Sequence, residues 1–146
     1  MVINPLEVEA RLDRLKSACR EQGLRMTHQR LEIYREVACT GEHPDAETIF
    51  KRVRDRMPMI SHDTVYRTLA FLEALGSVTR IDPAGGRARF DANTDEHHHF
   101  VCSECGSVSD VYINDPIPLP GGIEELGRAE SRHVQIRGVC NNCMSK

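Results

Sequence analysis

Apolar residues in the first half of the chain recur at intervals of three and four, the spacing that places side chains on one face of an α-helix. The first such stripe consists of Val8, Leu12, Leu15 and Cys19. Pro5 and Gly23 bracket this stripe, because proline favours the first turn of a helix and glycine its exit. The pattern predicts an amphipathic helix over residues 5–22.

Capping residues mark where three further helices are expected to begin. Thr27, Asp45 and Ser61 each precede an apolar stripe, and their side-chain oxygens can accept a hydrogen bond from the first turn of a helix. The predicted helices extend to about residue 40, to Pro58 and to residue 75. The first half of the chain is therefore predicted to be mainly helical.

The last of these helices has a polar face beside its apolar one. Its buried stripe is predicted to consist of Val65, Leu69 and Leu72. His62, Tyr66 and Arg67 lie nearer the opposite side of its first two turns. An arginine there can bind guanine with two hydrogen bonds or neutralise a phosphate, and a tyrosine ring can pack on a thymine methyl or donate to a phosphate. The alternative is an ordinary solvated helix face.

A β-hairpin is predicted after the helices, because residues 78–82 and 87–90 flank the turn sequence Pro83-Ala84-Gly85-Gly86. Helices followed by a hairpin give the element order of a winged helix-turn-helix domain. Residues 61–75 would then form the recognition helix, which enters the major groove of DNA by its N-terminal end.

Short elements separated by turns characterise the second half of the chain. Strands are predicted over residues 100–102, 107–113 and 133–139, with a short helix over residues 123–131. Prolines at positions 116, 118 and 120 mark a loop between them. The predicted fold class is therefore α+β, and the small second module is expected to need a metal ion, a partner subunit or both to stabilise its thin core.

The net charge of −3 is distributed unevenly along the chain. Residues 1–90 carry 15 Lys and Arg against 13 Asp and Glu, whereas residues 91–146 carry 4 against 9. This difference indicates two modules with different partners. The first ten residues lack the basic start and apolar core of a signal peptide, and there is no run of 18 apolar residues that could span a membrane. A cytoplasmic location is expected, where thiols stay reduced.

Two Cys-x-x-Cys pairs occur in the second half. Cys102 and Cys105 form one pair, Cys140 and Cys143 form the other, and 34 residues separate them. Four thiolates at this spacing suit one tetrahedral zinc ion, because each pair can bind the ion from its own turn. The alternatives are two disulfides or four idle buried thiols.

Three histidines, His97 to His99, lie just upstream of the first cysteine pair. On a strand, His97 and His99 point to the same side and can chelate one ion together, while His98 would serve elsewhere or face solvent. The other candidate ligands are His43, Asp91 and Asp110. Nitrogen and oxygen donors suit Fe²⁺, Mn²⁺ or Zn²⁺. A solvated polar loop or an accidental cluster would also explain the triplet, and periodicity does not bring His43 or Asp110 to it.

Taken together, these motifs resemble the ferric uptake regulator (Fur) family of metal-responsive repressors over roughly residues 11–143. The motifs that carry the resemblance are Leu24–Arg30, Glu42-His43-Pro44, Ser61–Arg67, Arg89-Phe90-Asp91, His97–Gly106 and Cys140–Cys143. Each motif is weak alone, but their combination in this order is highly specific.

The resemblance implies a winged-helix DNA-binding domain over residues 1–90, a connector carrying metal ligands over residues 91–97, and a dimerisation and metal-binding domain over residues 98–146. It also implies a homodimer that represses transcription from double-stranded DNA carrying an AT-rich inverted-repeat operator. An enzyme is not expected, because neither a Ser/His/Asp arrangement nor a nucleotide-binding glycine loop is present in the sequence.

The resemblance assigns the site residues in three groups. It implies a structural zinc ion held by Cys102, Cys105, Cys140 and Cys143. It implies a regulatory Fe²⁺ or Mn²⁺ ion held by His43, Asp91, His97, His99 and Asp110. It implies DNA contacts by Arg25, Tyr66 and Arg67. An ion that bound all five regulatory ligands would hold the two domains in one arrangement and favour the conformer that binds DNA.

Within the family, Asp110 and the short spacing from Asp91 to His97 are more similar to the peroxide-responsive (PerR-type) members than to the iron-responsive ones. Peroxide reacting at ferrous iron would then oxidise His43 or His97 and release repression. The alternative is an iron- or other metal-responsive repressor without peroxide sensing; a metalloenzyme is a weaker alternative.

The additional sensory site found in the family is incomplete in this sequence. His98 replaces a carboxylate, and Arg132 stands where a later histidine is expected, with His133 adjacent. One regulatory site per subunit is therefore expected, with a weak second site as the alternative.

Overall fold

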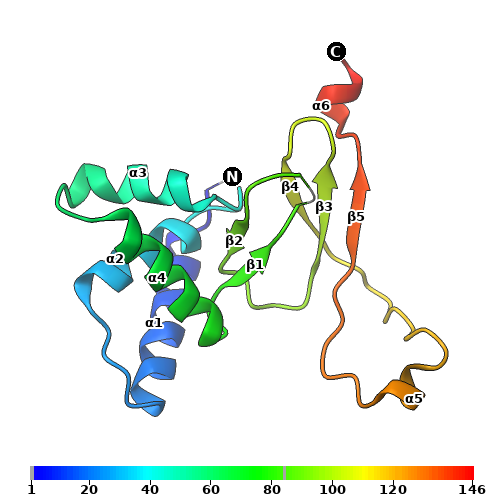
Figure 1. Cartoon of the computed structure of the whole chain (residues 1–146), viewed down its shortest axis with the longest axis horizontal. Helices are drawn as coiled ribbons and strands as arrows, with labels where there is room; N and C mark the ends of the chain where they lie inside the picture. Colours follow the sequence, from blue (N-terminus) through cyan, green and yellow to red (C-terminus); the bar gives the residue numbers. More distant parts are fainter. Residues whose placement is uncertain (1, 84) are drawn as a thin grey trace. The chain divides into compact units, whose positions relative to one another are not determined.

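The structure, a computed structural model, describes residues 2–83 and 85–146. It divides into two compact units, Met1–Thr94 and Asp95–Lys146, which we call the N-terminal unit and the C-terminal unit. Each unit is described by itself, with its elements labelled in Figure 1.

The N-terminal unit begins with the helices that the apolar stripes predict. These are α1 (Pro5–Glu21), α2 (His28–Ala38), α3 (Ala46–Arg56) and α4 (His62–Ala74). The predicted caps are confirmed at α2, α3 and α4, where Thr27, Asp45 and Ser61 each accept a hydrogen bond from a backbone N–H of the first turn. Their starts are therefore fixed by local chemistry that the sequence displays.

The predicted hairpin follows α4. Strand β1 (Thr79–Ile81) pairs antiparallel with β2 (Arg89–Asp91), with Arg80 opposite Phe90. In the turn between them, the N–H of Gly86 donates to the carbonyl of Pro83 over 3.1 Å. Ala84, which the predicted turn includes, lies outside the described residues.

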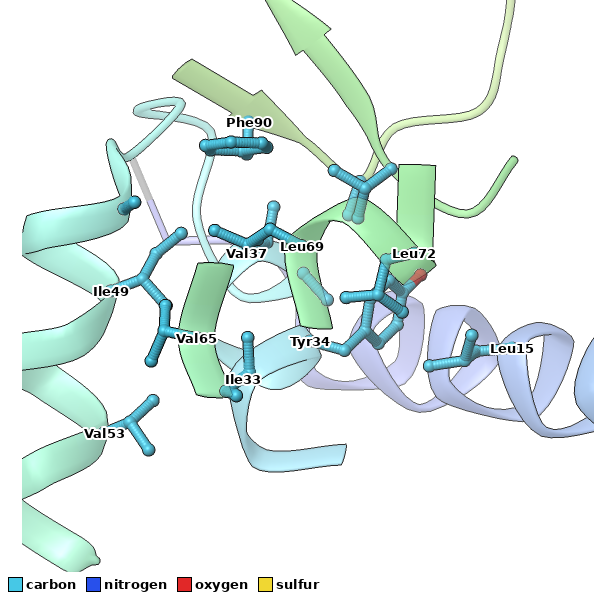
Figure 2. Packing of buried hydrophobic residues seen from close by; sticks show 14 of the residues in the cluster. Leu15, Ile33, Tyr34, Val37, Ile49, Val53, Val65, Leu69, Leu72 and Phe90 are labelled. Carbon is cyan, nitrogen blue, oxygen red and sulfur yellow. The ribbon is translucent and has the colours of Figure 1, made fainter. Parts of the chain in front are cut away.

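An apolar cluster of buried residues holds the N-terminal unit together. Figure 2 shows Val65, Leu69 and Leu72 of α4 directed toward side chains of α2 and α3. All three α4 side chains are at most 1 % exposed, and Ile33 of α2 is fully buried beside them. Phe90 of β2 joins the same cluster, so the hairpin is attached to the helices by its own apolar residue. The buried stripe leaves the opposite face of α4 exposed to solvent.

The C-terminal unit is built on a sheet with the strand order β4-β3-β5 (Figure 1). Its strands are β3 (His98–Cys102), β4 (Val108–Val111) and β5 (Gln135–Gly138). β3 pairs antiparallel with β4 and parallel with β5. The predicted strands are present, but β3 begins earlier than predicted and includes His98 and His99, because both residues pair with β4.

The helices of this unit differ from the prediction. The predicted helix over residues 123–131 is wrong in length, since α5 (Ile123–Leu126) ends at Gly127, whose φ of +151° is incompatible with a helix. A further short helix, α6 (Asn141–Met144), follows β5 and was not predicted. It begins directly after Cys140, which is its N-cap, and it contains Cys143.

Helices packed on a hairpin in one unit and a small mixed sheet in the other give the α+β class that the sequence predicts. Within the described part of the chain, every helix is too short or too polar to cross a bilayer.

Candidate functional site

The cysteines of the C-terminal unit form one cluster. Cys102 ends β3, Cys105 lies in the turn before β4, and Cys140 and Cys143 lie at α6. The Sγ atoms of the four lie within 4.8 Å of one another, with Cys102 to Cys143 at 4.0 Å and Cys105 to Cys140 at 3.8 Å. Zinc–sulfur bonds of about 2.3 Å in a tetrahedron place the sulfurs roughly 3.8 Å apart. The cluster therefore has the dimensions of a four-thiolate zinc site, and the predicted convergence of the pairs is observed.

Backbone hydrogen bonds shape each half of this cluster. The N–H of Gly106 donates to the carbonyl of Cys102 over 3.0 Å, and Gly106 has a φ of +72°, which favours glycine. At the other pair, the N–H of Cys143 donates to the carbonyl of Cys140 over 3.0 Å. Each Cys-x-x-Cys segment is thus a tight turn that directs both of its sulfurs to the same point.

The thiols differ strongly in acidity. Backbone N–H groups of Cys105 and Cys140 lower the pKa of the Cys102 thiol to about 6, and Cys140 donates over 3.3 Å. Hydrogen bonding with Cys140 raises the pKa of the Cys143 thiol to about 12. Neighbouring sulfurs repel one another when several are ionised, and a divalent cation at the centre would remove that repulsion. The donor set and its electrostatics fit a zinc ion.

Histidine and aspartate side chains form a second cluster in the C-terminal unit. The β3–β4 register places His99 opposite Asp110, and His97 precedes β3 on the same side as His99. The Nε2 atoms of His97 and His99 are 3.1 Å apart, and they lie 3.4 and 3.5 Å from Asp110 Oδ1. Both imidazoles are buried, with His99 completely inaccessible. Such spacing is that of neighbouring ligands about 2.1 Å from one ion.

Sequence alternation correctly separates His98 from this cluster. Of the two predicted alternatives for His98, a role elsewhere or exposure to solvent, exposure to solvent is wrong. His98 is 4 % exposed, and its Nδ1 accepts a hydrogen bond from the N–H of Val134 over 3.1 Å. His98 therefore joins β3 to the segment that precedes β5.

The outer nitrogens of the two clustered histidines have defined partners. Nδ1 of His97 lies 2.7 Å from the carbonyl oxygen of Asp95, which can only accept, so this Nδ1 carries the proton and Nε2 offers a lone pair. Nδ1 of His99 lies 2.9 Å from Nε2 of His133. The position of His133 was not predicted from the sequence, because it depends on the parallel pairing of β3 with β5.

The N-terminal unit contributes a second imidazole–carboxylate pair, His43 and Asp91. Nε2 of His43 lies 3.2 Å from Oδ2 of Asp91, and both side chains are buried. The other carboxylate oxygen of Asp91 accepts from the N–H of Asn93 over 2.8 Å. The pair has the donor types and the spacing of two ligands of one ion.

The chain holds His43 in place through β2. Arg89 donates to the carbonyl of His43 over 3.0 Å, and the N–H of Phe90 donates to the carbonyl of Pro44 over 3.1 Å. His43 itself has a φ of +53°, an uncommon conformation for a residue with a side chain. The backbone at this point is thus tied to the strand that ends in Asp91.

The residues predicted to contact DNA lie on the exposed side of the N-terminal unit. Arg25 and Arg67 line one groove, and Tyr66, which is 56 % exposed, lines another between α4 and the hairpin. Nε of Arg67 pairs with Oδ2 of Asp63 over 3.0 Å, one turn earlier on α4. The structure thus brings Arg25, from the segment between α1 and α2, to the same groove as Arg67 of α4, and Tyr66 precedes Arg67 on that helix.

Comparison with known proteins matches residues 21–118 to the family described as "Ferric uptake regulator family". The chain belongs to the ferric uptake regulator family. The match covers α2 to α4, the hairpin, the five His and Asp residues described above and the first cysteine pair. Members of this family are transcriptional regulators, so this Fur-family chain is a DNA-binding metalloregulator and not an enzyme.

Individual relatives agree with the family assignment. The peroxide-responsive repressor PerR of Staphylococcus aureus is 30% identical over 145 residues, covering 95% of each chain. The ferric uptake regulator Fur of Helicobacter pylori, described as having three functional metal-binding sites, is 22% identical with a TM-score of 0.73, over 100% of this chain and 98% of that one. The ferric uptake regulator of Vibrio cholerae is 29% identical with a TM-score of 0.63, over 85% of this chain and 98% of that one. These structures confirm the Fur-type fold with its winged-helix domain.

Proposed function

We propose that this Fur-family regulator is a metal-dependent repressor in which one Fe²⁺ or Mn²⁺ ion binds His43, Asp91, His97, His99 and Asp110. The observation that carries the proposal is that both units present imidazole and carboxylate donors at coordination spacing, all of them buried except the half-buried Asp110. Burying such groups is unfavourable unless they are paired or bind a cation. Nitrogen and oxygen donors of this kind suit first-row divalent metals.

An ion shared by the two units would act as a conformational switch. Two of its ligands belong to the N-terminal unit and three to the C-terminal unit, so binding all five selects one arrangement of the units. If that arrangement is the one that fits an operator, the ion raises the affinity for DNA by linkage. The structure of the Vibrio cholerae relative is described as revealing a rearrangement of the DNA-binding domains.

The four-cysteine cluster has a separate, structural role in this proposal. Zinc there would join the end of β3 to α6 and so fasten β5 to the sheet. Closed four-thiolate sites leave no open position for a signal molecule. The C-terminal unit would thereby keep its fold whether or not the regulatory ion is bound.

The C-terminal unit is proposed to form a homodimer. It exposes several large apolar side chains, namely Tyr112, Leu119, Leu126, Ile136 and Met144. β5 is an edge strand of its sheet, and edge strands are available for pairing with another chain. A dimer would give the regulator two α4 helices, which suits an inverted repeat in double-stranded DNA. We propose an AT-rich operator contacted by Arg25, Tyr66 and Arg67.

Peroxide is the signal that we favour. One support is that the carboxylate contributed by β4 is an aspartate, Asp110. The other is the 30% identity to the peroxide-responsive repressor of Staphylococcus aureus. In the net reaction, hydrogen peroxide would transfer one oxygen atom to the imidazole of His43 or His97 and its other oxygen would leave as water, so the histidine supplies the two electrons. Fe²⁺ would supply the redox chemistry that breaks the O–O bond. An oxidised His43 or His97 would lose its lone pair and could no longer bind the ion, so the regulator would leave the DNA.

Electrophoretic mobility shift with an AT-rich inverted repeat tests the repressor function. Zinc-loaded protein is expected to bind the repeat only when Mn²⁺ is added, and His43→Ala or Asp110→Ala is expected to abolish this activation while zinc content and dimer mass stay unchanged. Retention of Mn²⁺ activation by both variants would contradict the shared five-ligand site.

Peptide mass spectrometry of the Fe²⁺-loaded protein after dilute peroxide tests the signal. A one-oxygen addition on His43 or His97 is expected, with the Mn²⁺-loaded protein as the unreactive control. Unmodified histidines together with unchanged DNA binding would instead identify an iron- or other metal-responsive repressor without peroxide sensing.

A further inference from the structure

The two nitrogens of the His99 ring face different surroundings. Its Nε2 lies among the electron-pair donors of the cluster, 3.1 Å from Nε2 of His97 and 3.5 Å from Oδ1 of Asp110. Its Nδ1 lies 2.9 Å from Nε2 of His133, outside the cluster. A neutral imidazole carries one proton, and only the nitrogen without that proton can bind a metal.

The short His99–His133 contact can be made in two ways. Either His99 Nδ1–H donates to His133 Nε2, or His133 Nε2–H donates to His99 Nδ1. In the second case a neutral His99 would direct a proton at Nε2 into the cluster and exclude a cation. The direction of this hydrogen bond therefore decides whether His99 is a competent ligand.

We propose that His133 is a positioning residue that accepts the Nδ1–H of His99 and thereby directs the Nε2 lone pair of His99 to the regulatory ion. This inference rests on the proposed regulatory site. The acceptor on a metal-binding histidine fixes its tautomer and ring orientation and increases its basicity. His133 does this from outside the ligand set.

The backbone holds His133 at this distance. The N–H of His99 donates to the carbonyl of Val134 over 3.2 Å, and the N–H of Val134 donates to Nδ1 of His98 over 3.1 Å. Val134 is thus bound on two sides by β3, and His133 is its immediate neighbour. The parallel pairing continues with His99 opposite Gln135, so the contact follows from the sheet register.

His97 provides an internal comparison. Its Nδ1 is held by the carbonyl of Asp95, a backbone acceptor that no substitution removes. His99 depends on a side chain instead. Substitution at His133 should therefore affect one ligand of the cluster and leave the other in its correct tautomer.

His133 is also a practical site for substitution, because it is exposed whereas His99 is completely buried. His133→Leu removes the acceptor, and His133→Gln replaces it with an amide oxygen that can accept the same proton. Arg132→Gln is the matched control, since it changes the adjacent residue, which pairs with Glu96 over 3.9 Å.

The first measurement is a titration of the full-length, zinc-loaded protein with Mn²⁺. The electron paramagnetic resonance signal of free Mn²⁺ reports how much of the ion is bound. His133→Leu is expected to weaken Mn²⁺ binding about 10- to 100-fold, the usual effect of losing such a partner. His133→Gln should recover most of this loss, and Arg132→Gln should match the wild type. Equal affinity of His133→Leu and the wild type would overturn the proposal. So would an equal loss in the Leu and Gln variants, because His133 would then be a ligand itself.

The second measurement reads the tautomer directly, through two-bond ¹⁵N–¹H correlation of the histidine rings with zinc in the cysteine site. The wild type is expected to hold a larger fraction of the His99 proton on Nδ1 than His133→Leu does, with His133→Gln close to the wild type. Equal Nδ1-proton fractions in the wild type and His133→Leu would overturn the proposal. This result does not depend on regulatory metal, so failure of the wild type to bind Mn²⁺ would reject the proposed regulatory site while the tautomer still tests the role of His133.

Discussion

At the scale of single residues, Asp63 changes the charge of the surface that we propose to face DNA. It pairs with Arg67 on the exposed side of α4, and both side chains are largely exposed, at 69 and 80 %. An exposed ion pair of this kind contributes little to stability. In a complex with DNA, however, the Asp63 carboxylate would lie near phosphates and repel them. The same carboxylate holds the Arg67 guanidinium in one orientation.

Asp63→Asn is therefore expected to increase affinity for non-specific DNA and to reduce the preference for the operator. Arg67→Ala should weaken operator binding by about 1–3 kcal/mol. Fluorescence anisotropy with operator and scrambled duplexes at several salt concentrations measures both. An unchanged ratio of specific to non-specific affinity in Asp63→Asn would show that the ion pair has no part in recognition.

Residue identities and spacing predict much of the candidate site but not all of it. Strand alternation separates His97 and His99 from His98 without a structure, and the two Cys-x-x-Cys pairs indicate their own convergence. Asp110 could be assigned only through the family resemblance, because its position opposite His99 depends on the β3–β4 register. The His133 contact depends on pairing across 34 residues, and no local signal encodes it.

At the scale of elements, α3 illustrates how one cap sets a helix and responds to pH. The N–H of Thr48 donates to Asp45 over 2.8 Å. Burial acts to raise the pKa of the Asp45 carboxyl, but hydrogen bonds from the side chain and backbone of Thr48 outweigh it and hold the pKa below its ordinary value of 3.8. A carboxyl with a lowered folded pKa stabilises the fold above its unfolded pKa, and this contribution is lost as pH falls through the folded pKa.

Asp45→Asn keeps the cap but removes the charge, so the wild type is expected to exceed it in stability near neutral pH and to lose this advantage as pH falls below 3.8. Asp45→Ala, which loses the cap, should cost about 1 kcal/mol near neutral pH. Urea denaturation of the three proteins over a pH series measures their free energies of unfolding. Zinc is released at low pH from all three alike, so its loss cancels when their stabilities are compared. A constant difference between wild type and Asp45→Asn across the series would argue against the lowered pKa.

The elements of the N-terminal unit follow from local sequence, whereas those of the C-terminal unit do so only in part. Stripes and caps placed α1 to α4 because each helix buries one face in a shared core. α5 and α6 have no buried residue, so periodicity carried little information about them. Their limits are set by Gly127 and by the cysteine cluster.

At the scale of the whole molecule, the cysteine cluster is expected to decide whether the C-terminal unit folds. Binding free energies of structural zinc sites are on the order of 10 kcal/mol, which is comparable to the stability of an entire small domain. Cys102→Ser should release zinc, loosen β5 from β3 and yield monomers.

Cys39→Ser is the matched control, because Cys39 lies in the N-terminal unit and its thiol donates to the carbonyl of Glu36 over 3.6 Å, which a hydroxyl can also do. Metal analysis, circular dichroism and light scattering would follow zinc content, fold and mass. A zinc-free Cys102→Ser protein that remains a folded dimer would show that the cluster is dispensable for structure.

Strand β3 also constrains how the chain can vary in length. Only Phe100 and Val101 separate His99 from Cys102 along the sequence, and a one-residue insertion there would turn one of the two ligand sets to the opposite face of the sheet. By contrast, residues 112–131 are largely exposed and contain little regular structure. Insertions and deletions in this segment would leave both ligand sets in register, so length differences there are expected to spare metal binding even where they alter the proposed dimer surface, whereas insertions in β3 would disrupt a metal site.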